Sequence, residues 1–201
     1  MNWLLCLGML LGSFKPPQAR PALHEVEVLS STLIIHGKTN VNKFECELDQ
    51  RVDTETLRVT SEVTDLKLDF DGLVLKFDIS QFDCGHELMN KDFRSILKSE
   101  KHPFLFLKIN EIYINEETSL MEKLDVKSFV TISLAGVERT KMIEEATVIN
   151  HDDQIVTFKG SKVLQMTDFK IEPPTKFLGL VSVENALEVS FEIKMRTTPI
   201  K

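Results

Sequence analysis

The chain has 201 residues, 42% of them hydrophobic, and a net charge of −7, which suits one globular domain. Its excess of acidic side chains argues against nucleic acid as a partner, because Lys and Arg neutralise phosphate backbones. The aromatic residues are 13 Phe with one Trp and one Tyr. Phenylalanine favours a dry interior, because its side chain has no polar tip.

Residues 1–19 have the pattern of a secretory signal peptide. Their apolar run, from Trp3 to Phe14, is too short to span a bilayer but suits the hydrophobic region of a leader. We expect cleavage after Ala19, which leaves an exported domain of residues 20–201. The alternative is a buried N-terminal segment of a cytosolic protein.

The cysteine count agrees with export. Removing the leader also removes Cys6 and leaves two cysteines, Cys46 and Cys84. An even pair in an exported protein predicts a disulfide. The alternative is two buried free thiols that pack as small hydrophobic side chains.

A hairpin is predicted in the first half of the chain, after strands expected at 26–36, 44–48 and 57–63. Apolar residues occupy every second position in 66–70 and again in 73–79. The pair Asp71-Gly72 lies between the two runs and suits a two-residue type I′ turn. We therefore expect two antiparallel strands with one apolar face.

One short helix is predicted after the hairpin. Met89, Phe93 and Leu97 recur at helical spacing, Asn90 is a candidate N-cap, and Pro103 ends the segment. A helix of this size is too small to form a layer of its own, so we expect it to close or plug a sheet.

The second half of the chain returns to strands, predicted at 104–114, 126–134, 142–150, 155–166 and 187–195. The connection 167–184 is long, contains Pro173-Pro174 and is rich in apolar residues. It is expected to be a flap over one end of the sheet, or else a plain arm that caps the core.

Eight or nine such strands predict an all-β protein, an antiparallel barrel or sandwich. A closed up-and-down barrel removes exposed strand edges and can enclose one ligand at this strand number. Periodicity alone does not separate a solid core from a cavity for an apolar chain, and by itself it favours the solid core.

Four stretches together resemble the YceI-like family: TLIIHGKTNVNKFEC at 32–46, FDC at 82–84 leading to MNKDF at 89–93, VTISLAGV at 130–137, and MTDFKI at 166–171. Two positions depart from the usual pattern of that family. Lys170 stands where a small residue is common, and Glu138 stands where Thr is common.

The resemblance implies a lipocalin-like, up-and-down antiparallel barrel of eight strands with one short helix, located in the periplasm or secreted. It implies a lumen that accepts a polyisoprenoid, an isoprenoid quinone or another long-chain lipid, for storage or transport without catalysis. Transient contact with a membrane would then allow ligand exchange. The alternative is an exported structural or interaction module whose barrel core is filled.

Alternation places a set of large apolar side chains in the expected lumen: Leu66, Leu68, Phe70, Leu75, Phe77, Phe106, Phe158, Val189 and Phe191. Phe93 of the predicted helix and Phe177 of the flap are expected to close the barrel ends and to contact the ligand.

An enzyme is the competing class, and the sequence gives it little support. The five histidines are scattered without metal-ligand spacing, and the chain has no Gly-x-Ser-x-Gly motif or phosphate-binding loop. We therefore predict no catalytic residues, no metal and no cofactor.

Overall fold

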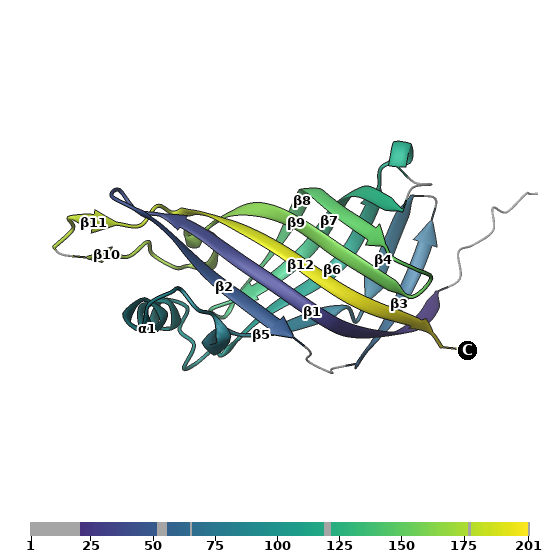
Figure 1. The fold of residues 1–201 in the computed structure, drawn as a ribbon, viewed down its shortest axis with the longest axis horizontal. Coiled ribbons are helices and arrows are strands. Elements are labelled where there is room, and N and C mark those ends of the chain that lie inside the picture. Colours follow the sequence, from purple (N-terminus) through teal and green to yellow (C-terminus); the bar gives the residue numbers. More distant parts are fainter. Residues whose placement is uncertain (1–20, 52–55, 65, 119–121, 177, 201) are drawn as a thin grey trace, which may run out of the picture.

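The computed structural model describes residues 21–51, 56–64, 66–118, 122–176 and 178–200 (Figure 1). The expected signal peptide lies outside the described residues. The elements are β1 (Ala22–Lys38), β2 (Lys43–Arg51), β3 (Thr56–Thr64), β4 (Lys67–Asp71), β5 (Val74–Asp78), η1 (Ile79–Gln81), α1 (Glu87–Ile96), β6 (Phe104–Ile114), η2 (Glu116–Thr118), β7 (Lys123–Leu134), β8 (Val137–Asn150), β9 (Ile155–Gln165), η3 (Met166–Phe169), β10 (Thr175–Lys176), β11 (Val181–Ser182) and β12 (Ala186–Pro199).

Eight strands form a ring of antiparallel hydrogen bonds. The order is β12-β9-β8-β7-β6-β4-β3-β1, and β1 pairs with β12 to close the ring. The predicted all-β, lipocalin-like barrel with one short helix is therefore confirmed. No helix in the described part of the chain is long and apolar enough to cross a membrane.

Strand β1 is long enough to take part in the whole height of the barrel. Its residues 22–27 pair with β3, and its residues 30–38 pair with β2 on the same side. Strand β12 runs along its other side from His24↔Pro199 to His36↔Glu188, with a register shift between Val28 and Ser30. A bulge of this kind bends a strand, so β1 can follow the curve of the wall.

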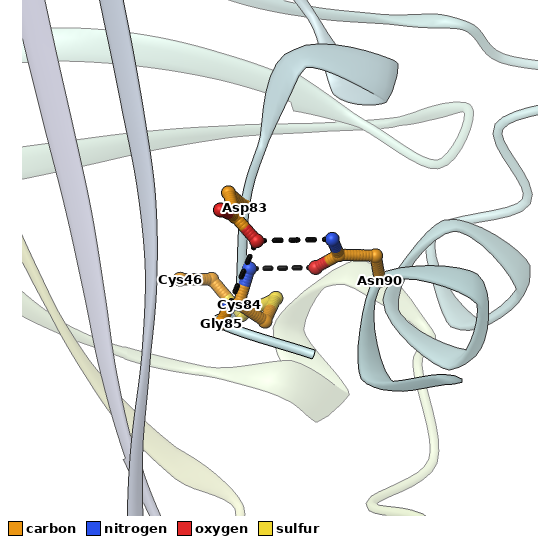
Figure 2. The surroundings of a disulfide bond; sticks show 5 residues. All are labelled: Cys46, Asp83, Cys84, Gly85 and Asn90. Carbon is orange, nitrogen blue, oxygen red and sulfur yellow. Dashed lines mark hydrogen bonds between the residues drawn. A yellow bond between two sulfur atoms is a disulfide. The ribbon is translucent and has the colours of Figure 1, made fainter. Parts of the chain in front are cut away.

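At the helix end, a seam separates β2 from β5. The described residues cross it by one isolated bridge, in which the backbone N–H groups of Glu47 and Asp83 donate to each other's carbonyls at 2.8 and 2.9 Å. Next to this bridge, Cys46 and Cys84 form a disulfide (Figure 2). The predicted disulfide thus closes the wall where the strands do not pair continuously.

Helix α1 is fastened to the same seam. The Asn90 side chain accepts a hydrogen bond from the Cys84 backbone N–H at 2.6 Å and donates to Asp83 Oδ1 at 3.0 Å (Figure 2). The prediction that Asn90 caps the helix is wrong. His86 is the N-cap, and its Nδ1 accepts from the Leu88 N–H at 3.2 Å, because the helix begins one turn earlier than its apolar periodicity indicated.

The predicted hairpin at Asp71-Gly72 is also wrong. Strands β4 and β5 do not pair with each other but lie end to end along β6. Gly72 has φ +85°, and a Cβ there would lie 2.5 Å from the Arg58 carbonyl oxygen of β3. The Asp-Gly pair therefore provides positive φ and close approach for a kink in one wall strand, not for a reversal of the chain.

We predict that the disulfide contributes about 4 kcal/mol to the free energy of unfolding, from loop-closure entropy across its 38-residue separation. The double variant Cys46→Ala/Cys84→Ala should unfold in urea at a correspondingly lower midpoint. Wild-type protein in reductant should shift to the midpoint of the variant, which itself should not respond. A wild-type midpoint that is insensitive to reductant would contradict the role of the disulfide.

Candidate functional site in the barrel interior

The barrel encloses two apolar cavities, one above the other along its axis. The helix-end cavity, next to α1 and η3, has a volume of about 120 Å³. The far-end cavity, next to β3 and β4, has a volume of about 270 Å³. The interior therefore contains apolar space beside its packed side chains.

The helix-end cavity is lined almost entirely by apolar side chains from both halves of the chain. Its apolar lining consists of Leu33, Ile35, Ile79, Phe82, Phe93, Leu97, Leu105, Leu107, Val130, Ile132, Leu134, Ile143, Leu164, Met166, Phe169, Ile171, Leu187, Val189 and Phe191. Three polar residues complete it, namely Lys141, Lys162 and Gln165. These three belong to the neighbouring strands β8 and β9, so the polar part of the wall lies on one side.

The far-end cavity has an apolar wall and a few polar residues. The apolar residues are Val26, Val59, Leu68, Phe70, Leu73, Ile109, Ile112, Ile114, Leu124, Val148, Val156, Phe158 and Met195, and the polar ones are His24, Ser61, Asn150 and Thr197. It takes no residue from α1 or η3.

Two phenylalanine rings, tilted against each other, lie between the linings of the two cavities. Phe158 and Phe191 lie with ring centroids 5.0 Å apart; Phe191 faces the helix-end cavity and Phe158 the far-end cavity. Gly160 makes room for them, because a Cβ there would lie 3.2 Å from Phe191 Cζ and 3.0 Å from the Glu145 carbonyl oxygen. The rings therefore form a waist between two otherwise adjoining spaces.

Two short elements cover the helix-end cavity. Helix α1 contributes Phe93, whose ring centroid lies 5.3 Å from that of Phe82. The turn η3 buries Met166 and Phe169 against the same space. Lys170 ends η3 in the left-handed conformation, with φ 55°, a conformation that favours glycine over residues with a Cβ atom.

The segment after η3 first covers the helix-end cavity and then continues as an arm. Strands β10 and β11 form a two-stranded ribbon that extends beyond the barrel beside the β1–β2 turn (Figure 1). The Asn40 side chain holds it by donating to the Leu180 carbonyl and accepting from the Ser182 N–H. Leu178 and Leu180 at its tip are 107% and 74% exposed. Both sequence-based alternatives for this segment thus hold in part.

The polar side of the helix-end cavity is built from two ion pairs. Lys141 Nζ lies 2.5 Å from Asp168 Oδ2, and Lys162 Nζ lies 3.5 Å from Glu144 Oε2. The hydrogen bond from Lys141 holds the pKa of the Asp168 carboxyl below its ordinary value of 3.8. Asp168 is therefore a carboxylate at neutral pH, paired with a lysine that also faces the cavity.

Most of the predicted lumen residues lie in the interior. Phe93, Val189 and Phe191 line the helix-end cavity. Those at the far-end cavity are Leu68, Phe70 and Phe158. Leu75 and Phe77 are buried in the packed wall, and Leu66 is half-buried; these three line neither cavity.

Two predicted lumen residues do not join them. Phe106 lies on the outer face, 37% exposed, because the inward positions of β6 are its neighbours Leu105 and Leu107. The run Phe104–Leu107 is apolar on both faces, so alternation could not show which set points inward. Phe177 lies outside the described residues.

Sequence reasoning missed part of the lining, including Leu33, Leu97 and Phe169. The alternation Leu33–Ile35 in β1 was available as a signal, whereas the role of η3 was not, because a single turn has no periodicity. The inward position of Lys162 could also have been found. It follows Val156, Phe158 and Gly160 at intervals of two along β9.

Among the described residues, no group of three or more His, Cys, Asp or Glu side chains could hold a metal ion. The fold and its interior define a β-barrel with apolar cavities inside it. That class is reached from the geometry alone.

Comparison with solved structures finds several similar chains. A polyisoprenoid-binding domain from Saccharophagus degradans, implicated in plant cell wall breakdown, matches with a TM-score of 0.58 and 10% identity, over 89% of this chain and all of the other. BcnA from Burkholderia cenocepacia matches at 0.49 with 12% identity, over 82% and 95% of the two chains. The YceI protein of Campylobacter jejuni matches at 0.43 with 16% identity, over 67% and 72%.

No protein-family model and no curated protein matches this sequence. The likeness that carries weight is therefore one of fold, to the polyisoprenoid-binding domain.

The Lys141–Asp168 pair predicts a specific pH dependence of stability. Because pairing lowers the folded-state pKa of Asp168 below its ordinary value of 3.8, the pair stabilises the fold above that pH and ceases to do so as the pH falls through the folded value. Urea midpoints of wild type and Asp168→Asn should differ at about pH 7, and the difference should shrink as the pH falls below the ordinary pKa of 3.8. Asp153→Asn, at an exposed turn, is the matched control. Equal midpoints at neutral pH would contradict the prediction.

Proposed function

We propose that this protein binds a long-chain apolar lipid, without catalysis, inside its barrel. The ligand class is a polyisoprenoid, an isoprenoid quinone or another fatty-chain molecule. The observation that carries the proposal is the helix-end cavity, an enclosed space with an almost wholly apolar lining. The fold shared with a polyisoprenoid-binding domain supports the same ligand class.

Binding would draw its free energy from removing the chain from water. Each buried CH₂ group contributes about 0.8 kcal/mol before the cost of ordering the chain. The chain would lie against Phe93, Val189 and Phe191, with η3 and α1 as covers. A longer chain would extend toward the far-end cavity if the rings of Phe158 and Phe191 turn aside.

We further propose that the protein works outside the cytoplasm, in the periplasm or secreted, and stores or transports its ligand there. The Cys46–Cys84 disulfide supports this location, because disulfides persist in oxidising compartments. The leader-like residues 1–19 support it from the sequence.

Ligand exchange would take place at a membrane through the tip of the β10–β11 arm. Leu178 and Leu180 are exposed there, and Val41 of the adjacent β1–β2 turn is exposed beside them. Large apolar side chains grouped at one end of a molecule suit contact with a lipid surface. The arm follows directly from η3, which covers the cavity.

The proposed function can be tested by native mass spectrometry of protein exported into a bacterial periplasm, followed by organic extraction of the same protein. A co-purifying lipid mass that is lost on denaturation would support it and name the ligand class. A ligand-free mass that gains nothing from added quinone or polyprenyl lipid would refute it, and an exported interaction module would become the leading alternative.

A matched pair of substitutions tests the cavity as the binding site. Val189→Trp would fill the helix-end cavity, whereas Val163→Trp places the same ring on the outer face of β9, where Val163 is exposed. We expect Val189→Trp to carry no lipid in the same native spectra and Val163→Trp to carry the wild-type load. Overpacking costs about 1–3 kcal/mol, so circular dichroism must show both variants folded. A loaded Val189→Trp variant would exclude this cavity.

If the β10–β11 arm contacts the membrane, a substitution at its tip should change the rate of lipid transfer but not the amount of lipid bound. Leu178→Ser should slow the transfer of a pyrene-labelled fatty acid from loaded protein to phosphatidylcholine vesicles that contain a quencher. Leu23→Ser makes the same change at the opposite end of the barrel and should transfer at the wild-type rate. Equal rates for all three proteins would exclude the arm as the membrane contact.

A further inference from the structure

The barrel wall is split between β8 and β9 at the helix end. These two strands pair only from Ala146↔Gly160 to Asn150↔Val156. Beyond that point, β8 remains paired with β7 and β9 with β12. Residues 137–145 of β8 and 161–165 of β9 therefore present two strand edges that do not pair with each other.

The split begins at a defined point in the sequence. The register of β8 against β7 shifts so that three steps on β8, from Ile143 to Ala146, oppose two on β7, from Val126 to Ser128. A bulge of this kind, here at Glu144 and Glu145, bends its strand. It lies next to Ala146, where the pairing of β8 with β9 ends. On the other strand, Gly160 is the last paired residue and packs against Ala146.

Charged side chains occupy the split where strand hydrogen bonds are missing. Lys141 on β8 and Lys162 on β9 both line the helix-end cavity, one from each edge, and their side chains are 27% and 30% exposed. Each pairs with a carboxylate, Lys141 with Asp168 and Lys162 with Glu144. Glu144 is 60% exposed and its oxygen is 3.5 Å from the lysine, so this second pair is the looser one.

We propose that the split is the headgroup site of the ligand and that the headgroup is anionic, a carboxylate or a phosphate. This inference rests on the proposed lipid binding and specifies its ligand as an amphiphile. The apolar tail lies in the helix-end cavity, and the head lies between the strand edges against Lys162 and Lys141. Gln165, which also lines the cavity and makes no side-chain capping bond, adds an amide donor.

The lysines in the cavity lining determine which charge the ligand headgroup should carry. Lys has three donors and no acceptor, and a charge-assisted hydrogen bond to an anion is stronger than one to a neutral oxygen. The anion would displace the exposed Glu144 from Lys162, whereas Asp168 keeps its short bond to Lys141. Lys162 is therefore the main specificity residue, and Glu144 is its competitor.

Equilibrium binding of four radiolabelled compounds to lipid-stripped mature protein tests the proposal. Palmitate and farnesyl phosphate carry the two anionic heads, and 1-hexadecanol and farnesol are their neutral counterparts. Wild type should bind at least one anion about tenfold more tightly than its alcohol. The anion with the larger preference identifies the head as carboxylate or phosphate.

Substitutions separate recognition from packing. Lys162→Met keeps the apolar stem and should remove the preference for the anion, while the affinity for the alcohol stays within about twofold. Lys162→Arg should retain the preference. Glu144→Gln should raise anion affinity by about threefold, because it removes an exposed competing charge. Lys159→Met, on the outer face of the same strand, should change nothing.

Each outcome decides the matter. Equal affinity of wild type for acid and alcohol overturns the headgroup site and leaves lipid binding standing. Equal weakening of both by Lys162→Met also overturns it, because that pattern belongs to packing. Failure of wild type to bind all four compounds overturns the lipid proposal together with the headgroup site.

Discussion

The pairing of the first strand with the last is the constraint on which the interior depends. Strand β12 aligns with β1 over nearly its whole length, and this contact turns a sheet with two edges into a ring. Both cavities draw on the two strands, with Leu33 and Val189 in one and Val26 and Met195 in the other. Without this pairing, the apolar faces of both strands would be open to water.

The ring is continuous at the far end and interrupted twice at the helix end. At one interruption, a disulfide and one bridge join β2 to the Asp83–Cys84 corner that follows β5 and η1. At the other, one ion pair joins Lys162 of β9 to Glu144 of β8, and Lys141 of β8 pairs with Asp168 of η3. A covalent bond cannot be replaced by a ligand, whereas an exposed ion pair can. Under the proposed headgroup site, the β8–β9 interruption would admit a ligand, whereas the disulfide-linked one would not.

Elements with a strong local sequence pattern were predicted correctly, whereas features that depend on tertiary contacts were not. The alternation in β12 is clean, and its inward set, which includes Val189 and Phe191, was placed correctly. The hairpin at Asp71-Gly72 failed because a positive φ is compatible with both a reversal and a kink, and only pairing with β6 decides between them. Phe106 failed because its strand is apolar on both faces. The prediction that Asn90 caps the helix failed because this side chain makes tertiary contacts instead, which fasten the helix to the Asp83–Cys84 corner.

The long separation between β1 and β12 also has a consequence for the order of folding. The contact that closes the ring joins residues 24–36 to residues 188–199, so a growing chain cannot form it until β12 has been synthesised. Contacts of such high sequence separation slow folding, because the entropy of closing the loop is lost before the contact stabilises the chain. Until then β1 and β9 each expose an edge that β12 later covers, and a chain held unfolded until β12 is available avoids that period.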